Sequence, residues 1–209
     1  MTVRYVFSPF LTVLCALLLT LSGCASTPNS NFYLLESLSG SRVPEGMIPL
    51  DQSISIGLGP VTLPDYLDRP QIVTRTNRNG VRLAEFDRWA EPLSGNVART
   101  LAEDLIALLH NDSVVPYPWP GSIGVTYQVL VDVVRFDGVL GEKAWLDAQW
   151  SVRDKRGKNV LMLKRSTFVE PTSGPSYGAL VAAQSRALEN LSREIATALQ
   201  GLSRDRVKE

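Results

Sequence analysis

Cys24 is the residue in this chain with the most distinctive chemistry, because of the residues that precede it. The stretch Leu21-Ser22-Gly23-Cys24 ends an apolar run that begins just after Arg4. The small side chains of Ser22 and Gly23 let a peptidase approach the backbone, and a cysteine thiolate is a nucleophile suited to forming a thioether with a diacylglycerol. The pattern predicts cleavage between Gly23 and Cys24 and attachment of lipid to Cys24.

Residues 1–23 have the parts of a bacterial lipoprotein signal peptide. Arg4 and the amino terminus supply positive charge, and the apolar run extends from Tyr5 to Leu21. The alternative is a transmembrane anchor, but the run is only about as long as a minimal membrane span and contains Ser8-Pro9. We therefore predict a signal peptide over residues 1–23, followed by a small, polar, lipidated tether over residues 24–31.

The composition argues against several classes of function. The 21 Lys and Arg residues balance the 21 Asp and Glu residues, so no nucleic-acid partner is expected. The chain has one histidine and two cysteines, of which Cys15 leaves with the signal peptide and Cys24 carries the lipid. We therefore expect no disulfide, no histidine-rich metal site and no cofactor apart from the covalent lipid.

The remaining chain predicts one α/β domain over residues 32–202, in which a mixed sheet is packed by two main helices. Hydrophobic alternation predicts strands over residues 32–35, 53–58, 71–76, 81–86, 125–136, 145–152 and 160–169. Asn79-Gly80 predicts a hairpin, the last three strands predict a meander, and Gly59-Pro60 is expected to interrupt a strand. Amphipathic helices are predicted from Pro92 to His110 and over residues 176–199.

The ends of the second helix carry capping signals. Ser176 is a candidate cap at its start, and Gly201 is a candidate cap at its end. Residues 203–209 are polar and are predicted to be a frayed tail. The two helices and the strands together must position any functional side chain.

The candidate binding residues lie in the segment between two predicted strands. Pro64 and Pro70 fix the backbone on either side of Tyr66, Leu67, Asp68 and Arg69. A stiff loop that presents Tyr and Arg suits a protein interface, and Trp89 could line the same surface. The alternatives are a local Asp68–Arg69 ion pair, a Tyr66 ring that closes the end of the sheet, and a Trp89 ring that packs at the start of the helix.

Other polar and aromatic residues are weaker candidates. The carboxylates of Asp132, Asp137, Glu142 and Asp147 suggest a paired-carboxylate glycan hydrolase, although solvated or paired structural positions are favoured. His110 is expected to interact with carbonyls at the end of a helix rather than with a substrate. Trp119, between two prolines, could contact a membrane or partner or could pack against the sheet.

Several segments together resemble the PqiC/YmbA family of auxiliary lipoproteins, which belong to intermembrane transport systems built on MCE-domain proteins. The lipobox, Phe32-Tyr33-Leu34-Leu35, the run from Ile56 to Arg75 and Trp89-Ala90-Glu91-Pro92-Leu93 carry the resemblance. Their order and spacing span nearly the whole mature chain, and Tyr66-Leu67-Asp68-Arg69-Pro70-Gln71 is the most specific part.

The resemblance implies a three-layer α/β domain with a five-stranded mixed sheet and no enzymatic activity. It also implies an outer-membrane lipoprotein on the periplasmic face, which suits Ala25 after the cysteine. Its expected partners are an MCE-domain tunnel protein and the inner-membrane permease that works with it, with a cyclic homo-oligomer as a further expectation. An envelope lipoprotein that scaffolds or activates a different machine is the alternative.

Overall fold

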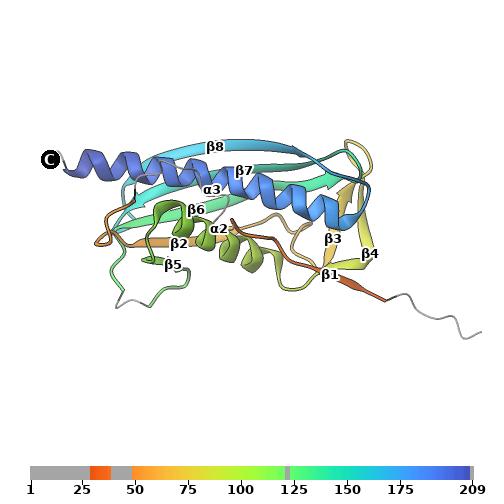
Figure 1. The fold of residues 1–209 in the computed structure, drawn as a ribbon, viewed down its shortest axis with the longest axis horizontal. Coiled ribbons are helices and arrows are strands. Elements are labelled where there is room, and N and C mark those ends of the chain that lie inside the picture. Colours follow the sequence, from red (N-terminus) through yellow and green to blue (C-terminus); the bar gives the residue numbers. More distant parts are fainter. Residues whose placement is uncertain (1–28, 39–48, 121–122, 208–209) are drawn as a thin grey trace, which may run out of the picture.

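The computed structural model describes residues 29–38, 49–120 and 123–207 as an elongated molecule (Figure 1). The predicted signal peptide, its cleavage site at Gly23 and the lipidation site at Cys24 lie outside the described residues. The strands are β1 (Asn31–Tyr33), β2 (Ile56–Thr62), β3 (Gln71–Arg75), β4 (Val81–Trp89), β5 (Val114–Pro116), β6 (Tyr127–Val139), β7 (Lys143–Asp154) and β8 (Val160–Pro171). The helices are α2 (Leu93–Leu109) and α3 (Tyr177–Val207).

The main sheet has five strands in the order β5-β2-β6-β7-β8. Strand β2 runs parallel to β5 and β6, and β6, β7 and β8 form the predicted antiparallel meander. Alternate residues of β6 and β7, including Val129, Val131, Leu146 and Trp150, are at most 1% exposed, so one face of the sheet forms the core. The predicted α/β class and five-stranded mixed sheet are confirmed.

Both helices cover that same face. Helix α2 lies on β2 and β5, helix α3 lies across β6, β7 and β8, and the two helices pack against each other. Ser176 caps α3, since its Oγ accepts the backbone N–H of Ala179 at 3.1 Å. The expectation that Gly201 ends this helix, with a frayed tail from Ser203, is wrong: α3 continues to Val207. Leu202, beyond Gly201, packs against the core and offsets the helix propensity that glycine lacks.

The predicted hairpin is confirmed, but it does not join the main sheet. Strands β3 and β4 pair antiparallel, and Asn77 closes their turn by accepting the backbone N–H groups of Asn79 and Gly80. Strand β1 pairs parallel to β4, which gives a separate three-stranded sheet in the order β1-β4-β3. This small sheet lies at one end of the molecule, and the carboxyl end of α3 lies at the other (Figure 1).

Strand β2 also differs from its prediction, because it runs through Gly59-Pro60 instead of stopping there. The register between β2 and β6 shifts between Leu58 and Val61, so the strand absorbs the proline as an irregularity. Gly59 has a φ of +114°, and a Cβ at this position would lie 2.8 Å from the Tyr117 Cβ. Glycine is therefore required for β2 to pass beneath the segment after β5.

The segment after β1 crosses the helices and is held by buried polar side chains. The backbone N–H groups of Leu35 and Leu38 donate to Asn96 Oδ1 at 3.2 Å and to Asp104 Oδ1 at 2.7 Å. Asp104 is fully buried, and Ser192 Oγ of α3 donates to its other oxygen at 2.7 Å. Asp104 thus links the amino-terminal segment, α2 and α3.

Burial raises the pKa of Asp104 to about 6, although the hydrogen bonds from Leu38 and Ser192 oppose this shift. The pKa of Asp104 is thus higher in the folded protein than its ordinary value of 3.8, so the fold favours the protonated side chain. The stability that this protonation contributes is fully present below about pH 4 and is lost as the pH rises through 6. We expect Asp104→Asn to be more stable than the parent protein at pH 7.5 by about 2 kcal/mol, with most of the gain absent at pH 4.5.

An asparagine can replace every hydrogen bond at this position. Its carbonyl would accept the Leu38 N–H, and its amide would donate to Ser192 Oγ, whose proton would then turn from residue 104 to the Leu188 carbonyl at 3.0 Å. Urea unfolding of both proteins at the two pH values measures the effect. Equal stability differences at pH 4.5 and 7.5 would show that Asp104 does not titrate in this range.

Candidate docking surface beside the 63–70 loop

The proline-containing segment between β2 and β3, here called the 63–70 loop, is fixed by its own backbone. The Leu67 N–H donates to the Pro64 carbonyl at 2.9 Å, and the Arg69 N–H donates to the Leu67 carbonyl at 2.8 Å. The Trp89 N–H donates to the Pro70 carbonyl at 2.7 Å, which ties the loop to the end of β4. These bonds, with the two prolines, hold the loop in one shape.

Leu67 is a core residue. Its side chain is 1% exposed and belongs to the main hydrophobic cluster. The partner contact predicted for Leu67 therefore does not fit the structure, because the side chain would have to leave the core to meet another protein. Its role is to fasten the 63–70 loop to the domain.

Asp68, Arg69 and Trp89 lie around one shallow hollow. The hollow has a volume of about 330 Å³ and is completed by Pro70 and the residues from Ala90 to Pro92. Asp68 is exposed, Arg69 is half-buried, and Trp89 is 5% exposed and forms part of the wall. Three of the five predicted contact residues thus come together at one place.

Arg69, which lines this hollow, has one unpaired donor that is buried within the fold. Its Nε is buried and has no hydrogen-bond partner, and no ion pair joins Arg69 to Asp68 within the described part of the chain. A buried guanidinium N–H without an acceptor is costly to the isolated protein. Because this Nε is not exposed, a partner in the hollow would meet the other atoms of the half-buried Arg69 side chain.

Tyr66 lies in a different cluster, around the buried carboxylate of Asp137 on β6. Arg75 Nε donates to Asp137 Oδ2 at 2.8 Å and Arg135 Nε donates to Oδ1 at 2.7 Å, while the Tyr66 hydroxyl reaches Oδ2 at 3.3 Å. The Arg135 guanidinium also stacks over the Trp145 ring at 4.1 Å. This cluster joins the small sheet and the 63–70 loop to the main sheet.

The electrostatics of the Asp137 cluster follow from these contacts. The hydrogen bond with Asp137 raises the pKa of Arg75, so the guanidinium of Arg75 stays protonated. Burial, together with the nearby Asp137 charge, raises the pKa of Tyr66. Tyr66 is therefore a neutral hydrogen-bond donor with a structural position, rather than a free interface side chain.

Sequence reasoning missed the roles of Arg75 and Arg135 and treated Asp137 as a candidate hydrolase carboxylate. The signal that could have found them is the strand register, because Asp137 and Arg135 alternate on β6 while Arg75 ends the neighbouring hairpin strand. Two arginines converging on one apolar-flanked aspartate predict a buried ion cluster. Recognising this cluster from the sequence would also require the contact between β3 and β6, which no local sequence pattern indicates.

Of the other candidate carboxylates, Glu142 is exposed in the turn between β6 and β7, and Asp132 and Asp147 have separate partners. Asp132 accepts from Thr62 Oγ1 at 2.6 Å, and Asp147 forms a two-point ion pair with Arg165. The hydrogen bonds from Arg165 lower the pKa of Asp147, so this carboxylate stays ionised as a structural partner. Within residues 29–38, 49–120 and 123–207, no group of three or more His, Cys, Asp or Glu side chains could hold a metal ion.

His110 and Trp119 also have structural positions. His110 follows α2 in the left-handed conformation, and its backbone N–H donates to the Ile106 carbonyl. Trp119 packs over Gly57 of β2, where an added Cβ would lie 2.9 Å from its ring, and it meets Tyr117 edge-on with ring centres 5.5 Å apart. Packing against the sheet, one of the two alternatives for Trp119, is what the structure shows.

The architecture is that of a small α/β domain with a shallow hollow beside the 63–70 loop and an amino-terminal segment that crosses its helices. Residues 33–196 match the family model of the ABC-type transport auxiliary lipoprotein component. The chain belongs to this family. In the described residues, no helix combines the length and the apolar character needed to span a membrane.

Solved structures agree with the fold. A Xanthomonas campestris protein has 17% sequence identity and a TM-score of 0.68, and the match covers 84% of this chain and 99% of that chain. An uncharacterized protein has 18% identity and a TM-score of 0.67, over 82% and 99% of the two chains. A search of curated proteins gave no match. The family assignment makes this chain an auxiliary component of a transport system. This class of protein is not defined by enzymatic activity.

Proposed function

We propose that this protein is an outer-membrane lipoprotein on the periplasmic face, where it docks an MCE-domain tunnel protein of an intermembrane lipid transport system. The family assignment supports an auxiliary transport role, and the lipobox at Cys24 supports attachment by lipid. Stable membrane attachment requires two or more acyl chains, which a diacylglycerol thioether provides. The inner-membrane permease of the same system is the indirect partner.

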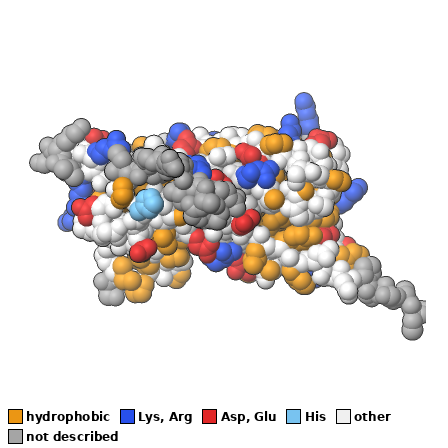
Figure 2. Space-filling model, viewed as in Figure 1, with side chains coloured by type: hydrophobic (Ala, Val, Ile, Leu, Met, Phe, Trp, Pro, Cys, Tyr) orange, Lys and Arg blue, Asp and Glu red, His pale blue; other side chains and the backbone are white. Residues whose placement is uncertain are grey.

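The end of the molecule that carries β1 faces the membrane in this proposal. The chain enters the fold at β1, directly after the tether, and Phe32, Leu34, Val81 and Leu83 at this end are exposed by between 42% and 64%. Figure 2 shows apolar side chains on the surface at the end that holds β1 and β4. Exposed apolar residues beside a lipid anchor favour contact with the membrane surface.

The observation that carries the docking proposal is the shallow hollow where the half-buried Arg69 side chain lies beside the Trp89 wall and the exposed Asp68. The hollow combines an aromatic wall, two prolines and a half-buried arginine, and aromatic and arginine side chains are typical of interface hot spots. The partner segment is expected to place an acidic or carbonyl oxygen against Arg69 and an apolar side chain against Trp89.

We expect Arg69→Glu to reduce recovery of the MCE-domain protein by at least about tenfold, since it replaces a donor by a repelling charge. The measurement is affinity purification of the full-length lipoprotein from crosslinked envelopes, with quantitative mass spectrometry of the recovered proteins. Arg82→Glu is the matched control, because Arg82 is an exposed arginine of β4 that does not line the hollow.

Recovery that is unchanged by Arg69→Glu, or reduced equally by Arg82→Glu, would place the docking surface elsewhere. Recovery of a different envelope machine through Arg69 would favour the scaffolding alternative. The proposed cyclic homo-oligomer is a separate matter, which mass measurement of the purified protein decides.

A further inference from the structure

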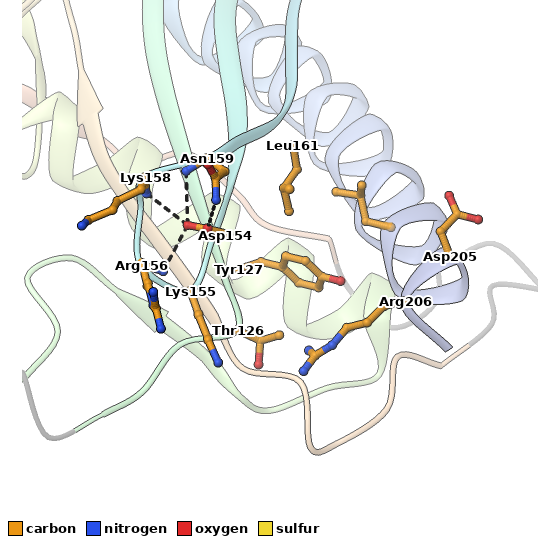
Figure 3. Close-up of a pocket in the computed structure, with 11 residues that line it drawn as sticks. Thr126, Tyr127, Asp154, Lys155, Arg156, Lys158, Asn159, Leu161, Asp205 and Arg206 are labelled. Carbon is orange, nitrogen blue, oxygen red and sulfur yellow. Dashed lines mark hydrogen bonds between the residues drawn. The ribbon is translucent and has the colours of Figure 1, made fainter. Parts of the chain in front are cut away.

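A second hollow lies at the end of the molecule opposite β1. It has a volume of about 610 Å³ and opens between the β7–β8 turn and the last turns of α3 (Figure 3). This volume is within the range of small-molecule sites in proteins. None of its lining residues belongs to the docking surface around Arg69, so the proposed partner does not account for it.

The floor of this hollow is apolar. Tyr127 is 4% exposed and forms part of the core, whereas Leu161 of β8 is 43% exposed and Leu202 of α3 is only partly buried. Leu161 and Tyr127 both line the hollow, and Figure 3 shows them on the same side of it as the end of α3. Burial of an exposed leucine by a ligand removes apolar surface from water, which favours binding.

The rim is strongly basic. Lys155, Arg156, Lys158 and Arg206 are all exposed, and none forms an ion pair within the described part of the chain. Figure 3 shows Lys155 and Arg206 on the two sides of Thr126; Asp205 also lines the hollow, and in this view its carboxylate lies on the side of α3 farther from Lys155. The rim therefore presents unpaired positive charge beside an apolar floor.

The one acidic side chain of the β7–β8 turn is already engaged by the turn itself. Asp154 Oδ1 accepts the backbone N–H groups of Arg156 at 3.1 Å and Lys158 at 3.0 Å, and Asn159 Nδ2 donates to Oδ2 at 2.6 Å. Gly157 completes the turn with a φ of +68°. The lysines are thus presented from a braced turn, and Asp154 is not available to pair with them.

We propose that this hollow binds an anionic phospholipid, with one acyl chain on Leu161, Leu202 and Tyr127 and the phosphate between Lys155 and Arg206. Positive charge alone would suit many anions, but the apolar floor selects a ligand that carries a hydrocarbon chain next to its negative group. The preference for a lipid over other amphiphiles rests on the proposed transport function. The site itself does not depend on docking through Arg69.

Photolabelling of the full-length protein tests this site. The probe is phosphatidylglycerol with a diazirine near the end of one acyl chain, presented in mixed micelles with a non-ionic detergent. We expect labelled peptides that contain Leu161 or Leu202. Lys155→Gln combined with Arg206→Gln should reduce this labelling by roughly tenfold, as expected for loss of a charge-assisted contact. Arg204→Gln is the control for the Arg206→Gln change, because it removes one positive charge from α3 outside the hollow.

Additional arms identify the ligand. Unlabelled phosphatidylglycerol should compete with the probe, whereas inorganic phosphate at the same concentration should compete only weakly. A phosphatidylcholine probe of the same design should label the protein only weakly. Equal competition by phosphate would mean that the site recognises only the phosphate group. Leu161→Ser should reduce labelling while circular dichroism stays unchanged. Labelling elsewhere, or equal loss in Arg204→Gln, would overturn the proposal. Arg69→Glu should leave labelling intact, so failure of docking and failure of this site are distinguishable.

Discussion

Removal of both arginines from the Asp137 cluster, as Arg75→Met with Arg135→Met, is expected to lower the free energy of unfolding by about 4 kcal/mol. The reason is the asymmetry of burial. The Asp137 side chain is 0% exposed, whereas Arg75 and Arg135 are 25% and 29% exposed. Loss of both cations leaves a buried carboxylate with only the long Tyr66 hydrogen bond, and the protein must either hold an unpaired charge or protonate it.

Three variants separate charge from packing in this cluster. Asp137→Leu alone should cost less than the double arginine variant, about 2 kcal/mol, because the arginines left behind can hydrate at the surface. Combining all three substitutions should restore part of the stability that the double variant loses, since no buried charge remains. Urea unfolding at pH 7 measures all three, and a triple variant less stable than the double variant would contradict this explanation.

Gly138→Ala is expected to destabilise the fold by about 2 to 3 kcal/mol through overpacking. Gly138 lies on β6 opposite Ala144 of β7, beneath the first turns of α3. An added Cβ would lie 2.5 Å from Leu180 Cδ1, 2.7 Å from the Lys143 carbonyl oxygen and 3.1 Å from the Ala144 Cα. Leu180 can move, but the backbone atoms of β7 cannot move without breaking the sheet.

Gly95→Ala is the matched control for this substitution. Gly95 lies in α2, and nothing lies within 4 Å of its added Cβ, so the same chemical change should stabilise the protein by about 0.5 to 1 kcal/mol. Thermal unfolding followed by circular dichroism compares the two variants. A Gly138→Ala protein as stable as Gly95→Ala would mean that the α3–sheet contact is looser than the structure indicates.

Strongly periodic segments could be predicted from the sequence because burial of one face dictates their pattern. Val97, Leu101, Leu105 and Leu108 recur along α2 and are all at most 1% exposed, and the valines of β6 alternate into the core as expected. The hairpin at Asn79-Gly80 was predictable from its turn chemistry. These features are determined by residues close together in the chain.

The features that differ from the prediction depend on contacts between distant segments. The short β1 pairs with β4, so the hairpin forms its own sheet, and no local pattern encodes this pairing. Helix α3 passes Gly201 because Leu202 packs on the core, and β2 passes Pro60 because β6 shifts register beside it. Tertiary packing overrides local propensity in each case.

The candidate site shows the same division. The prolines predicted a stiff 63–70 loop, and the structure places Asp68, Arg69 and Trp89 around one hollow. Local sequence could not show that Leu67 points into the core or that Tyr66 turns toward Asp137. It also gave no sign of the basic hollow beside Leu161, whose parts come from the start of β6, the β7–β8 turn, β8 and α3.

The most direct test of the docking proposal is photo-crosslinking in intact cells from a benzophenone amino acid placed at Asp68. Asp68 is exposed on the rim of the hollow, so the substitution should not disturb the fold. The same probe at Arg165, which is 60% exposed on β8 and outside the hollow, is the control. We predict a crosslinked product with an MCE-domain protein from position 68 and none from position 165. Crosslinks to that protein from position 165 alone, or from neither position, would contradict docking at this surface.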